Sequence, residues 1–257
     1  MASFADLPVP RGLDPLYFDR RRSLNAALGF AGCKGGPALC VDVGANVGQT
    51  LKTFLAWWPR AFCVSFEPHP EAWKEPSKTS KSFGERAVAY NVGVSDSIGR
   101  LTLYTHRQES VQSSFRAFNR ESETIAAHRG LRRGSSIFED DGSEDISIDV
   151  PVTTLDIHFA ESTGPDRSWS KNGFDLLKID TQGWDLHVLR GASRTLRNTR
   201  VVLLEWQFDD IYGRATPIAE LDALMTTAGF RLWDITHVYK DLKILRTLWA
   251  DLVYVRA

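Results

Sequence analysis

The chain has 257 residues, of which 43% are hydrophobic and 25% charged, a composition typical of a folded globular protein rather than a disordered or fibrous one. Its formal net charge is −1, so no overall positive field draws it to nucleic acid or to an anionic membrane surface. The three cysteines show no Cys-x-x-Cys spacing, which argues against a zinc site and a disulfide framework.

The first predicted element is a helix that follows Asp14, a residue suited to capping, with Pro15 at the first helical position. Apolar residues at helical spacing surround a run of three arginines, and glycines from Gly29 onward end the segment. The sequence therefore predicts an N-terminal helical extension within residues 1–37.

Strand and helix patterns then alternate along the chain. Apolar runs predict strands at 38–43, 61–66 and 87–92, and a helical pattern at 49–58 separates the first two. Strands that are apolar on both faces are typical of a parallel sheet covered by helices.

The middle of the chain has a different pattern. Residues 101–104 and 146–152 are predicted as strands, and the polar segment between them carries arginines first and acidic residues second. A loop of this length inside a compact domain is usually functional or disordered. We expect an insertion over about residues 101–170, and both a solvated loop and a lid over the substrate remain open.

Regular alternation then resumes. Strands are predicted at 174–180 and 201–205, helices at 185–196 and 218–228, and a closing antiparallel pair at 230–236 and 250–255. Neither an internal repeat nor a second core is evident, so the sequence predicts one α/β domain over residues 1–257.

The strongest local motif is Val-Asp-Val-Gly-Ala-Asn-Val-Gly at residues 41–48, where a predicted strand enters a glycine turn. Asn46 occupies the place of the second glycine of a dinucleotide fingerprint, which disfavours a pyrophosphate ligand. S-adenosylmethionine has no phosphate and tolerates an Asn here, and Asp42 then faces its cationic methionine end. Gly44 and Gly48 allow close approach of the backbone. A tight turn without a ligand is the alternative.

Two further residues follow predicted strands. Glu67 ends the second strand and is suited to accept both ribose hydroxyls of a nucleoside, although NAD enzymes use the same device. Asn91 ends the third strand, where a nucleoside site supplies groups near the adenine. A surface carboxylate and an ordinary Asn-containing turn are the structural alternatives.

The fourth and fifth strands also end in polar residues. Lys178 and Asp180 lie two apart on a buried strand, so we expect them to interact with each other or with Glu205. Trp184 and Trp206 follow on the presumed ligand side and are candidates to contact the acceptor.

Taken in order from Leu39 to Glu205, these motifs resemble the FkbM-type methyltransferases. The resemblance rests on VDVGANVG, FEPHP, NVGVSD, VTTLD, DLLKIDTQGWDLHVLRGA and LLEW. It implies a Rossmann-like class I methyltransferase fold, with a mostly parallel seven-stranded sheet, C-terminal antiparallel strands and an insertion between the third and fourth core strands. It also implies S-adenosylmethionine as cofactor and O-methylation of a hydroxyl on a sugar or natural product.

The resemblance assigns cofactor binding to residues that match its motifs: Asp42, Gly44, Asn46, Gly48, Glu67 and Asn91. Asp180 matches the Asp that precedes the family's usual Glu-Gly pair, but Gln182 stands where Glu is common. Because a glutamine side chain cannot act as a base, another group must take any chemical role of that carboxylate.

Methyl transfer to a hydroxyl needs a base, and the candidates are Asp180 first, Glu205 second and His69 third. A divalent cation held by Asp180 and Glu205, with Asp209 or Asp210, is an alternative that we do not predict. The competing functions are a non-catalytic nucleoside-binding protein and an NAD-linked oxidoreductase.

The expected partner is a small-molecule acceptor, with no nucleic acid and no membrane. The N-terminal segment lacks the apolar core of a secretory signal, and the cysteines read as reduced, so we expect a cytoplasmic location. The sequence predicts neither the oligomeric state nor the identity of the acceptor.

Overall fold

The computed structural model describes residues 15–105, 113–117, 119, 122, 146–164, 166, 172–210, 212–213, 217–241 and 246–257. Of the predicted insertion, most of the arginine-rich and acidic segment lies outside these residues, as does Asp14. The predicted N-terminal helix is confirmed as α1, Pro15–Phe30.

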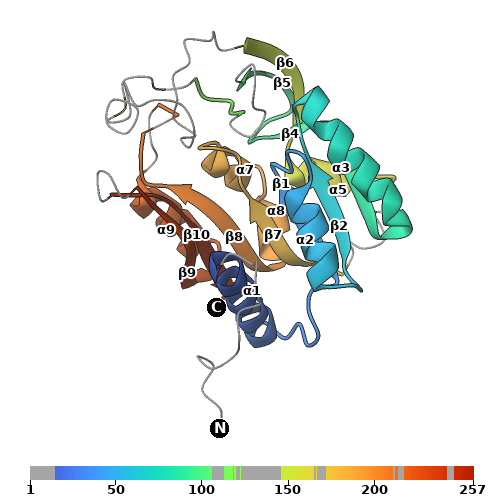
Figure 1. Ribbon diagram of the computed structural model, residues 1–257, viewed down its shortest axis with the longest axis vertical. Helices are drawn as coiled ribbons and strands as arrows, with labels where there is room; N and C mark the ends of the chain where they lie inside the picture. Colours follow the sequence, from blue (N-terminus) through green and yellow to red (C-terminus); the bar gives the residue numbers. More distant parts are fainter. Residues whose placement is uncertain are drawn as a thin grey trace.

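A seven-stranded sheet forms the centre of the molecule, in the order β3-β2-β1-β7-β8-β10-β9 (Figure 1). Its strands are β1 (Leu39–Val43), β2 (Phe62–Phe66), β3 (Ala87–Tyr90), β7 (Phe174–Ile179), β8 (Thr199–Gln207), β9 (Phe230–Asp241) and β10 (Arg246–Arg256). The first five in the order are mutually parallel, and β10 runs antiparallel to both β8 and β9. The predicted sheet, mostly parallel with C-terminal antiparallel strands, is confirmed.

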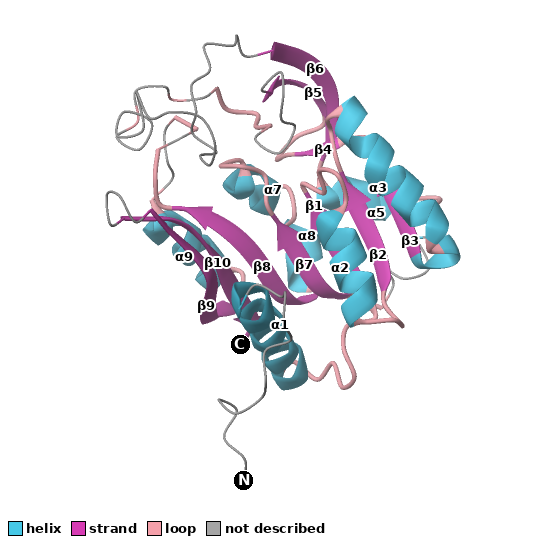
Figure 2. Cartoon of the chain, in the orientation of Figure 1, coloured by secondary structure: helices cyan, strands magenta, loops and turns pink. Residues whose placement is uncertain are grey.

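Helices cover both faces of this sheet (Figure 2). They are α1, α2 (Gln49–Trp57), α3 (Pro70–Ser82), the short 3-10 helix η2 (Gly84–Arg86), α5 (Leu155–Glu161), α7 (Asp185–Arg190), α8 (Ser193–Arg197) and α9 (Ile218–Thr227). Apolar residues of α1 and α2 form one buried cluster against the sheet. Those of α5, α7, α8 and α9 form a second cluster on the opposite face.

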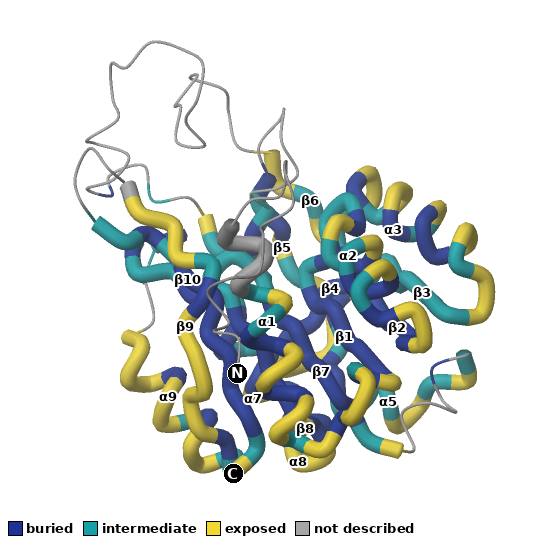
Figure 3. The backbone as a smooth tube through the Cα atoms, turned by 60° about the horizontal axis from the view of Figure 1, so that its bottom comes forward, coloured by how far each residue is buried: buried dark blue, intermediate teal, exposed yellow. Residues whose placement is uncertain are grey.

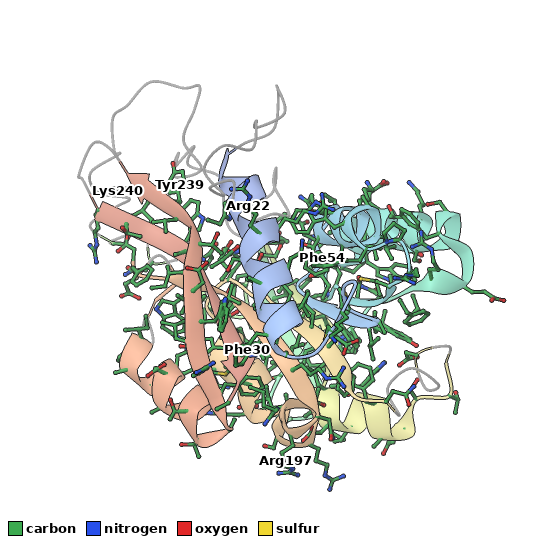
Figure 4. The ribbon with its side chains drawn as sticks, turned by 90° about the horizontal axis from the view of Figure 1, so that it is seen from below. Arg22, Phe30, Phe54, Arg197, Tyr239 and Lys240 are labelled. Carbon is green, nitrogen blue, oxygen red and sulfur yellow. The ribbon has the colours of Figure 1, made fainter. Side chains whose placement is uncertain are left out.

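The central strands are buried because helices cover both of their faces. Every residue of β1, β2 and β7 is buried, and Figure 3 shows these strands inside a shell of exposed segments. Figure 4 shows α1 lying across one face, with Phe54 of α2 beside it. Any charged side chain on these strands is therefore enclosed by apolar neighbours and needs a partner.

A smaller three-stranded sheet lies between β3 and β7 in the chain. It consists of β4 (Gly93–Val94), β5 (Gly99–Thr105) and β6 (Ile146–Thr153), with β6 in the middle. The two predicted strands of the insertion are thus confirmed, and they pair antiparallel with each other.

The single helix predicted at 185–196 is wrong, because the segment forms two short helices, α7 and α8. The break falls at Gly191, where a Cβ atom would lie 2.0 Å from the backbone oxygen of Ser95. The close approach of the β4–β5 turn therefore requires glycine here. Helix α5, which the sequence analysis missed, begins where Thr154 accepts a hydrogen bond from the Ile157 N–H (3.0 Å).

None of the helices in the described part of the chain is long and apolar enough to cross a membrane.

Candidate active site

The candidate site lies at the carboxyl edge of the parallel strands. β1 and β7 are neighbours in the sheet, yet β1 leads into α2 on one face and β7 leads into α7 on the other. Ligands of open α/β sheets bind at such a switch point, outside the carboxyl ends of the strands. The turns after β1, β2, β3, β7 and β8 all reach this edge.

The turn after β1 is shaped by Gly44. Its φ of 81° lies in the left-handed region, and a Cβ atom there would lie 1.9 Å from the backbone oxygen of Asp180. The N–H groups of Gly44 and Ala45 both donate to the Phe66 carbonyl at 3.0 Å, which joins this turn to the end of β2. Glycine is required because the turns after β1 and β7 touch through their backbones.

Two other residues of the motif also have left-handed backbones. Gly48, with φ 82°, begins α2, and a Cβ atom there would lie 3.1 Å from Cα of Pro76 in α3. Asn46 has φ 45°, a conformation that Asn adopts more readily than most residues. The motif thus specifies the path of the backbone from β1 into α2.

Glu67 is held by backbone groups of both neighbouring turns. The Asn46 N–H donates to Oε2 (2.7 Å) and the His69 N–H donates to Oε1 (2.8 Å). The side chain is 5% exposed, and burial raises the pKa of Glu67 to about 7, although the two N–H groups lower it. A carboxylate has about four lone-pair positions, so each oxygen retains one for a further donor such as a ribose hydroxyl.

Asn91 and His69 stabilise the same corner of the site. Asn91 Nδ2 donates to the backbone oxygens of Glu67 (2.8 Å) and Pro68 (3.1 Å). His69 caps α3, because its Nδ1 accepts from the Ala72 N–H (3.3 Å), and burial lowers the pKa of its ring. The structure therefore places His69 beside the expected ribose carboxylate and not among the acidic groups of β7 and β8.

A row of charged residues crosses the face of the sheet that carries α1 and α2. Asp42, Lys178, Glu205 and Asp251 each lie two residues along their strand from a member of the apolar cluster on that face, so their side chains point to the same face. Asp42 is paired in register with Lys178, and Glu205 with Asp251. The predicted association of Lys178 and Asp180 is part of this row.

Lys178 is the central cation of the row. Its Nζ lies 3.2 Å from Asp42 Oδ1 and 3.1 Å from Asp180 Oδ2. Burial lowers the pKa of Lys178, but the Asp180 and Asp42 carboxylates outweigh burial and raise it above the usual lysine value. Lys178 therefore stays charged and stabilises both carboxylates.

Gln182 connects the ends of β7 and β8. Its Nε2 donates to Asp180 Oδ1 (2.8 Å) and to Glu205 Oε1 (3.1 Å). Its Oε1 accepts from the Tyr212 hydroxyl (2.6 Å) and from Gln207 Nε2 (2.9 Å). The residue that departs from the family motif thus joins the two carboxylates proposed as bases.

Glu205 is a carboxyl group with a perturbed pKa. Burial, followed by the Asp180 and Asp251 carboxylates, raises the pKa of Glu205 well above its usual value. Asp180 has both oxygens engaged, by Lys178 and Gln182. At Glu205, Oε1 accepts from Gln182, and no described group is hydrogen-bonded to Oε2.

The two tryptophans lie in different surroundings. Trp184 is half-buried, donates from Nε1 to Ser95 Oγ (3.1 Å) and stacks on the His187 ring at 3.8 Å between centroids. Trp206 is 5% exposed and belongs to the apolar cluster on the face opposite Glu205. Its contact with an acceptor stays a prediction, and the site described here does not need it.

Several polar residues of the site were missed by sequence reasoning. Arg20 of α1 is ion-paired with Asp251, and Tyr212 and Gln207 hold Gln182. Asp251 stands in an otherwise apolar run, which was a visible signal of a buried, paired charge. Tyr212 gave no such signal, because it follows β8 in a polar stretch.

The donor set between the carboxylates does not suit a cation. Among the residues that the structure describes, no group of three or more His, Cys, Asp or Glu side chains could hold a metal ion. The Gln182 amide presents N–H donors to Asp180 and Glu205. Asp209 lies 3.6 Å from Arg246 NH1, and Asp210 accepts from Asn119 Nδ2 (3.1 Å).

The sheet order, the glycine turn and the acidic residues after β2, β7 and β8 define a Rossmann-like methyltransferase of the class that uses S-adenosylmethionine. The sequence profile described as the Methyltransferase FkbM domain matches residues 42–232, which is more than half of the chain. The chain belongs to the FkbM methyltransferase family.

Individual relatives are distant. 2-O-methyltransferase NoeI of Sinorhizobium fredii (strain NBRC 101917 / NGR234) is 24% identical over 190 residues, covering 72% of this chain and 70% of the relative. Methyltransferase sdnD of Sordaria araneosa is 26% identical over 208 residues, covering 77% and 74%. The solved structure of magnesium protoporphyrin IX methyltransferase ChlM from Synechocystis PCC 6803 matches with TM-score 0.46 and 10% identity, covering 98% of this chain and 86% of that one.

Proposed function

We propose that the protein transfers a methyl group from S-adenosylmethionine to a hydroxyl of a sugar or small natural-product acceptor, with Glu205 as the base. The observation that carries the proposal is a half-buried carboxyl group of raised pKa, held at one oxygen by Gln182, at the carboxyl edge of β8. A hydroxyl acceptor needs such a base, because its own pKa is far above neutrality.

The residues around the switch point fit the cofactor. Both oxygens of the fully buried Asp42 lack a hydrogen-bond partner among the described groups, although Lys178 is ion-paired with Oδ1. The acidic set of Asp42, Glu67 and Asp180 exceeds the single charge of Lys178 and suits a ligand with a sulfonium and an ammonium group. Glu67 would bind the ribose hydroxyls and Asn91 would lie near the adenine, while Gly44, Asn46 and Gly48 would form the turn beneath the ligand.

The bound cofactor supplies an activated methyl group, and the protein supplies orientation and a proton acceptor. Glu205 takes the hydroxyl proton on Oε2. Asp180, whose two oxygens are bound by Lys178 and Gln182, holds these two side chains in place rather than acting as the base. This reverses the order of Asp180 and Glu205 as candidate bases that the sequence suggested. His69 is not proposed as a base, because its ring caps α3.

The nature of the acceptor rests on similarity. The relative NoeI is named as a 2-O-methyltransferase, which favours oxygen over nitrogen or carbon as the receiving atom. The polar side chains of Gln182, Gln207 and Tyr212 suit an acceptor with several hydroxyls. A cytoplasmic location is part of the same proposal.

The test is a methyl-transfer assay with labelled S-adenosylmethionine and a panel of methyl glycosides, using wild type, Glu205→Gln and Asp180→Asn. We expect Glu205→Gln to lower kcat by about 10²-fold or more, as loss of a general base does. Because the pKa of Glu205 is raised, kcat of the wild type should rise with pH, with a midpoint above the usual range of a glutamic acid.

Glu220→Gln is the matched control, because Glu220 lies on α9 and is ion-paired with Arg190 at the surface. It should leave kcat unchanged. Calorimetric titration with S-adenosylmethionine should give the same affinity for wild type and Glu205→Gln. Full activity of Glu205→Gln would contradict the assignment of the base. Cofactor binding without transfer to any acceptor would instead support a non-catalytic binding protein.

A further inference from the structure

The link between Asp180 and Glu205 passes through one side chain. Both carboxylates are hydrogen-bonded to the same nitrogen, Gln182 Nε2, at 2.8 Å and 3.1 Å. Two carboxylates this close to one point normally share a proton, because their like charges disfavour ionisation of both. A primary amide nitrogen carries two hydrogens, so it can supply one to each carboxylate and has no proton to lose at neutral pH.

The orientation of this amide is fixed from its other end. Gln182 Oε1 accepts from the Tyr212 hydroxyl at 2.6 Å and from Gln207 Nε2 at 2.9 Å. Reversing the amide would place its oxygen against the two carboxylate oxygens and its nitrogen against the Gln207 amide nitrogen. The nitrogen therefore faces Asp180 and Glu205 in the folded protein.

The backbone of Gln182 is constrained as well. Its φ of 52° lies in the left-handed region, and its carbonyl accepts from Ser114 Oγ at 2.7 Å. A non-glycine residue in this conformation needs support from its surroundings and often marks a functional site. Here the conformation turns the side chain back toward the carboxyl ends of β7 and β8.

We propose that Gln182 is a positioning residue, whose amide prevents Asp180 and Glu205 from sharing a proton and leaves Glu205 Oε2 available to the acceptor hydroxyl. This inference rests on the proposed function, and it extends that function by dividing the roles of the two carboxylates. Asp180 is bound at both oxygens, by Lys178 and by the amide. Glu205 gains and loses its proton without sharing it with Asp180.

Other charged and titratable groups surround the pair from every neighbouring element. They are Lys178 on β7, Asp42 on β1, Asp185 on α7, Asp251 on β10, Arg20 on α1 and Tyr212 after β8. Of the charged neighbours, Asp180 and Asp251 raise the pKa of Glu205, and Lys178 and Arg20 lower it. Gln182 adds no charge of its own, so its removal tests the amide alone.

The experiment is a carboxyl ¹³C NMR titration of the wild type, Gln182→Met and Gln182→Glu, with Glu205→Gln used to assign the Glu205 signal. In wild type Glu205 should titrate in one step. In Gln182→Met, which is close in size and uncharged, we expect its midpoint to rise by about one pH unit or more, because the N–H bond to the carboxylate is lost. Gln182→Glu should show the same rise and one further group that titrates near neutrality.

The matched control is Asn198→Asp, an amide-to-acid change at an exposed residue just before β8, at the opposite edge of the sheet. It should leave the Glu205 midpoint unchanged. With an acceptor in hand, the acid limb of the kcat profile of Gln182→Glu should move to higher pH, and activity should recover in alkaline solution. The KM for S-adenosylmethionine should not change.

A Glu205 midpoint that is the same in wild type and Gln182→Met would overturn the proposal and would make Gln182 a packing residue. If Gln182→Met fails to fold, Gln182→Leu, which is also uncharged, provides the same readout. The titration needs no acceptor, so it reports on Gln182 even if the wild type methylates nothing. An active wild type with an unmoved midpoint would refute only this inference and leave the proposed function in place.

Discussion

The two halves of the site are held together in different ways. In the cofactor half, which follows β1, β2 and β3, the polar side chains bind backbone groups: Glu67 accepts from two N–H groups and Asn91 donates to two carbonyls. In the acceptor half, at the ends of β7 and β8, side chains bind other side chains: Lys178, Asp180, Gln182 and Glu205 form one connected network.

This difference has a physical consequence. A backbone group keeps its place when a neighbouring side chain is changed, so the cofactor half should tolerate most single side-chain substitutions. A network of side chains that are buried or half-buried depends on every member, because a lost partner leaves a polar group with little access to water unpaired. The four predictions below test this contrast, from the largest expected effect to the smallest.

Replacing Lys178 with Met should have the largest effect. It would leave Asp42 and Asp180 without their shared cation in a buried site, which costs about 3 to 5 kcal/mol of unfolding free energy. Urea unfolding measures this loss. Lys78→Met on α3 is the control, because its Glu75 pair is exposed and should contribute almost nothing. Equal losses in the two variants would show that the network does not depend on its cation.

Gly44→Ala tests the backbone of the cofactor half. The new Cβ would overlap the Asp180 carbonyl, so we expect a loss of about 3 kcal/mol in urea unfolding and weak cofactor binding. Gly84→Ala is the matched control, since Gly84 also has a positive φ (60°) but no atom within 4 Å of the added Cβ. It should cost about 1 kcal/mol. A Gly44→Ala variant as stable as Gly84→Ala would contradict the close approach of the two turns.

The pH dependence of cofactor binding tests Glu67. Its pKa is raised to about 7 by burial, so the carboxylate gains a proton as the pH falls through neutrality and loses acceptor positions for the ribose hydroxyls. The Kd for S-adenosylmethionine should therefore increase several-fold between about pH 8 and about pH 6 in calorimetric titration. Glu67→Gln should bind more weakly at all pH values and with a flatter profile. An unchanged slope in this variant would place the titrating group elsewhere.

Asn91→Ala should have the smallest effect of the four. It removes two hydrogen bonds to the carbonyls of Glu67 and Pro68, which costs about 1 to 2 kcal/mol of stability. The backbone bonds to the Glu67 carboxylate remain, so we expect less than a tenfold loss of cofactor affinity. A complete loss of cofactor binding would show that Asn91 contacts the cofactor directly. It would also show that backbone hydrogen bonds do not determine the cofactor affinity of this half.

The same contrast explains what the sequence could predict. The glycine turn, Glu67 and Asn91 stand at fixed distances from the ends of predicted strands, so a motif locates them. The parallel strands of the sheet and its antiparallel closing pair also follow from local patterns. The helix break at Gly191 could not be predicted, because it depends on contact with Ser95, about a hundred residues earlier in the chain.

The acceptor half depends on residues that are distant in sequence. Gln182 was visible as a departure from the family motif, but its partners Gln207 and Tyr212 were not. Arg20 lies on the N-terminal helix and is ion-paired with Asp251 on β10. Single-sequence patterns carry no information on such pairs, because each partner satisfies its local pattern independently.

The position of β10 also affects the order in which the protein folds during synthesis. β10 lies between β8 and β9 in the sheet but follows both in the chain. β9 therefore has no strand to pair with when it leaves the ribosome, whereas each of β2, β3, β7 and β8 meets a neighbour that has already been made. Until β10 enters the sheet, the edge of β8 stays open to pairing with other chains, and Glu205 has no Asp251 beside it. A nascent chain can thus assemble its cofactor half early, and its acceptor half becomes complete only with the last strand.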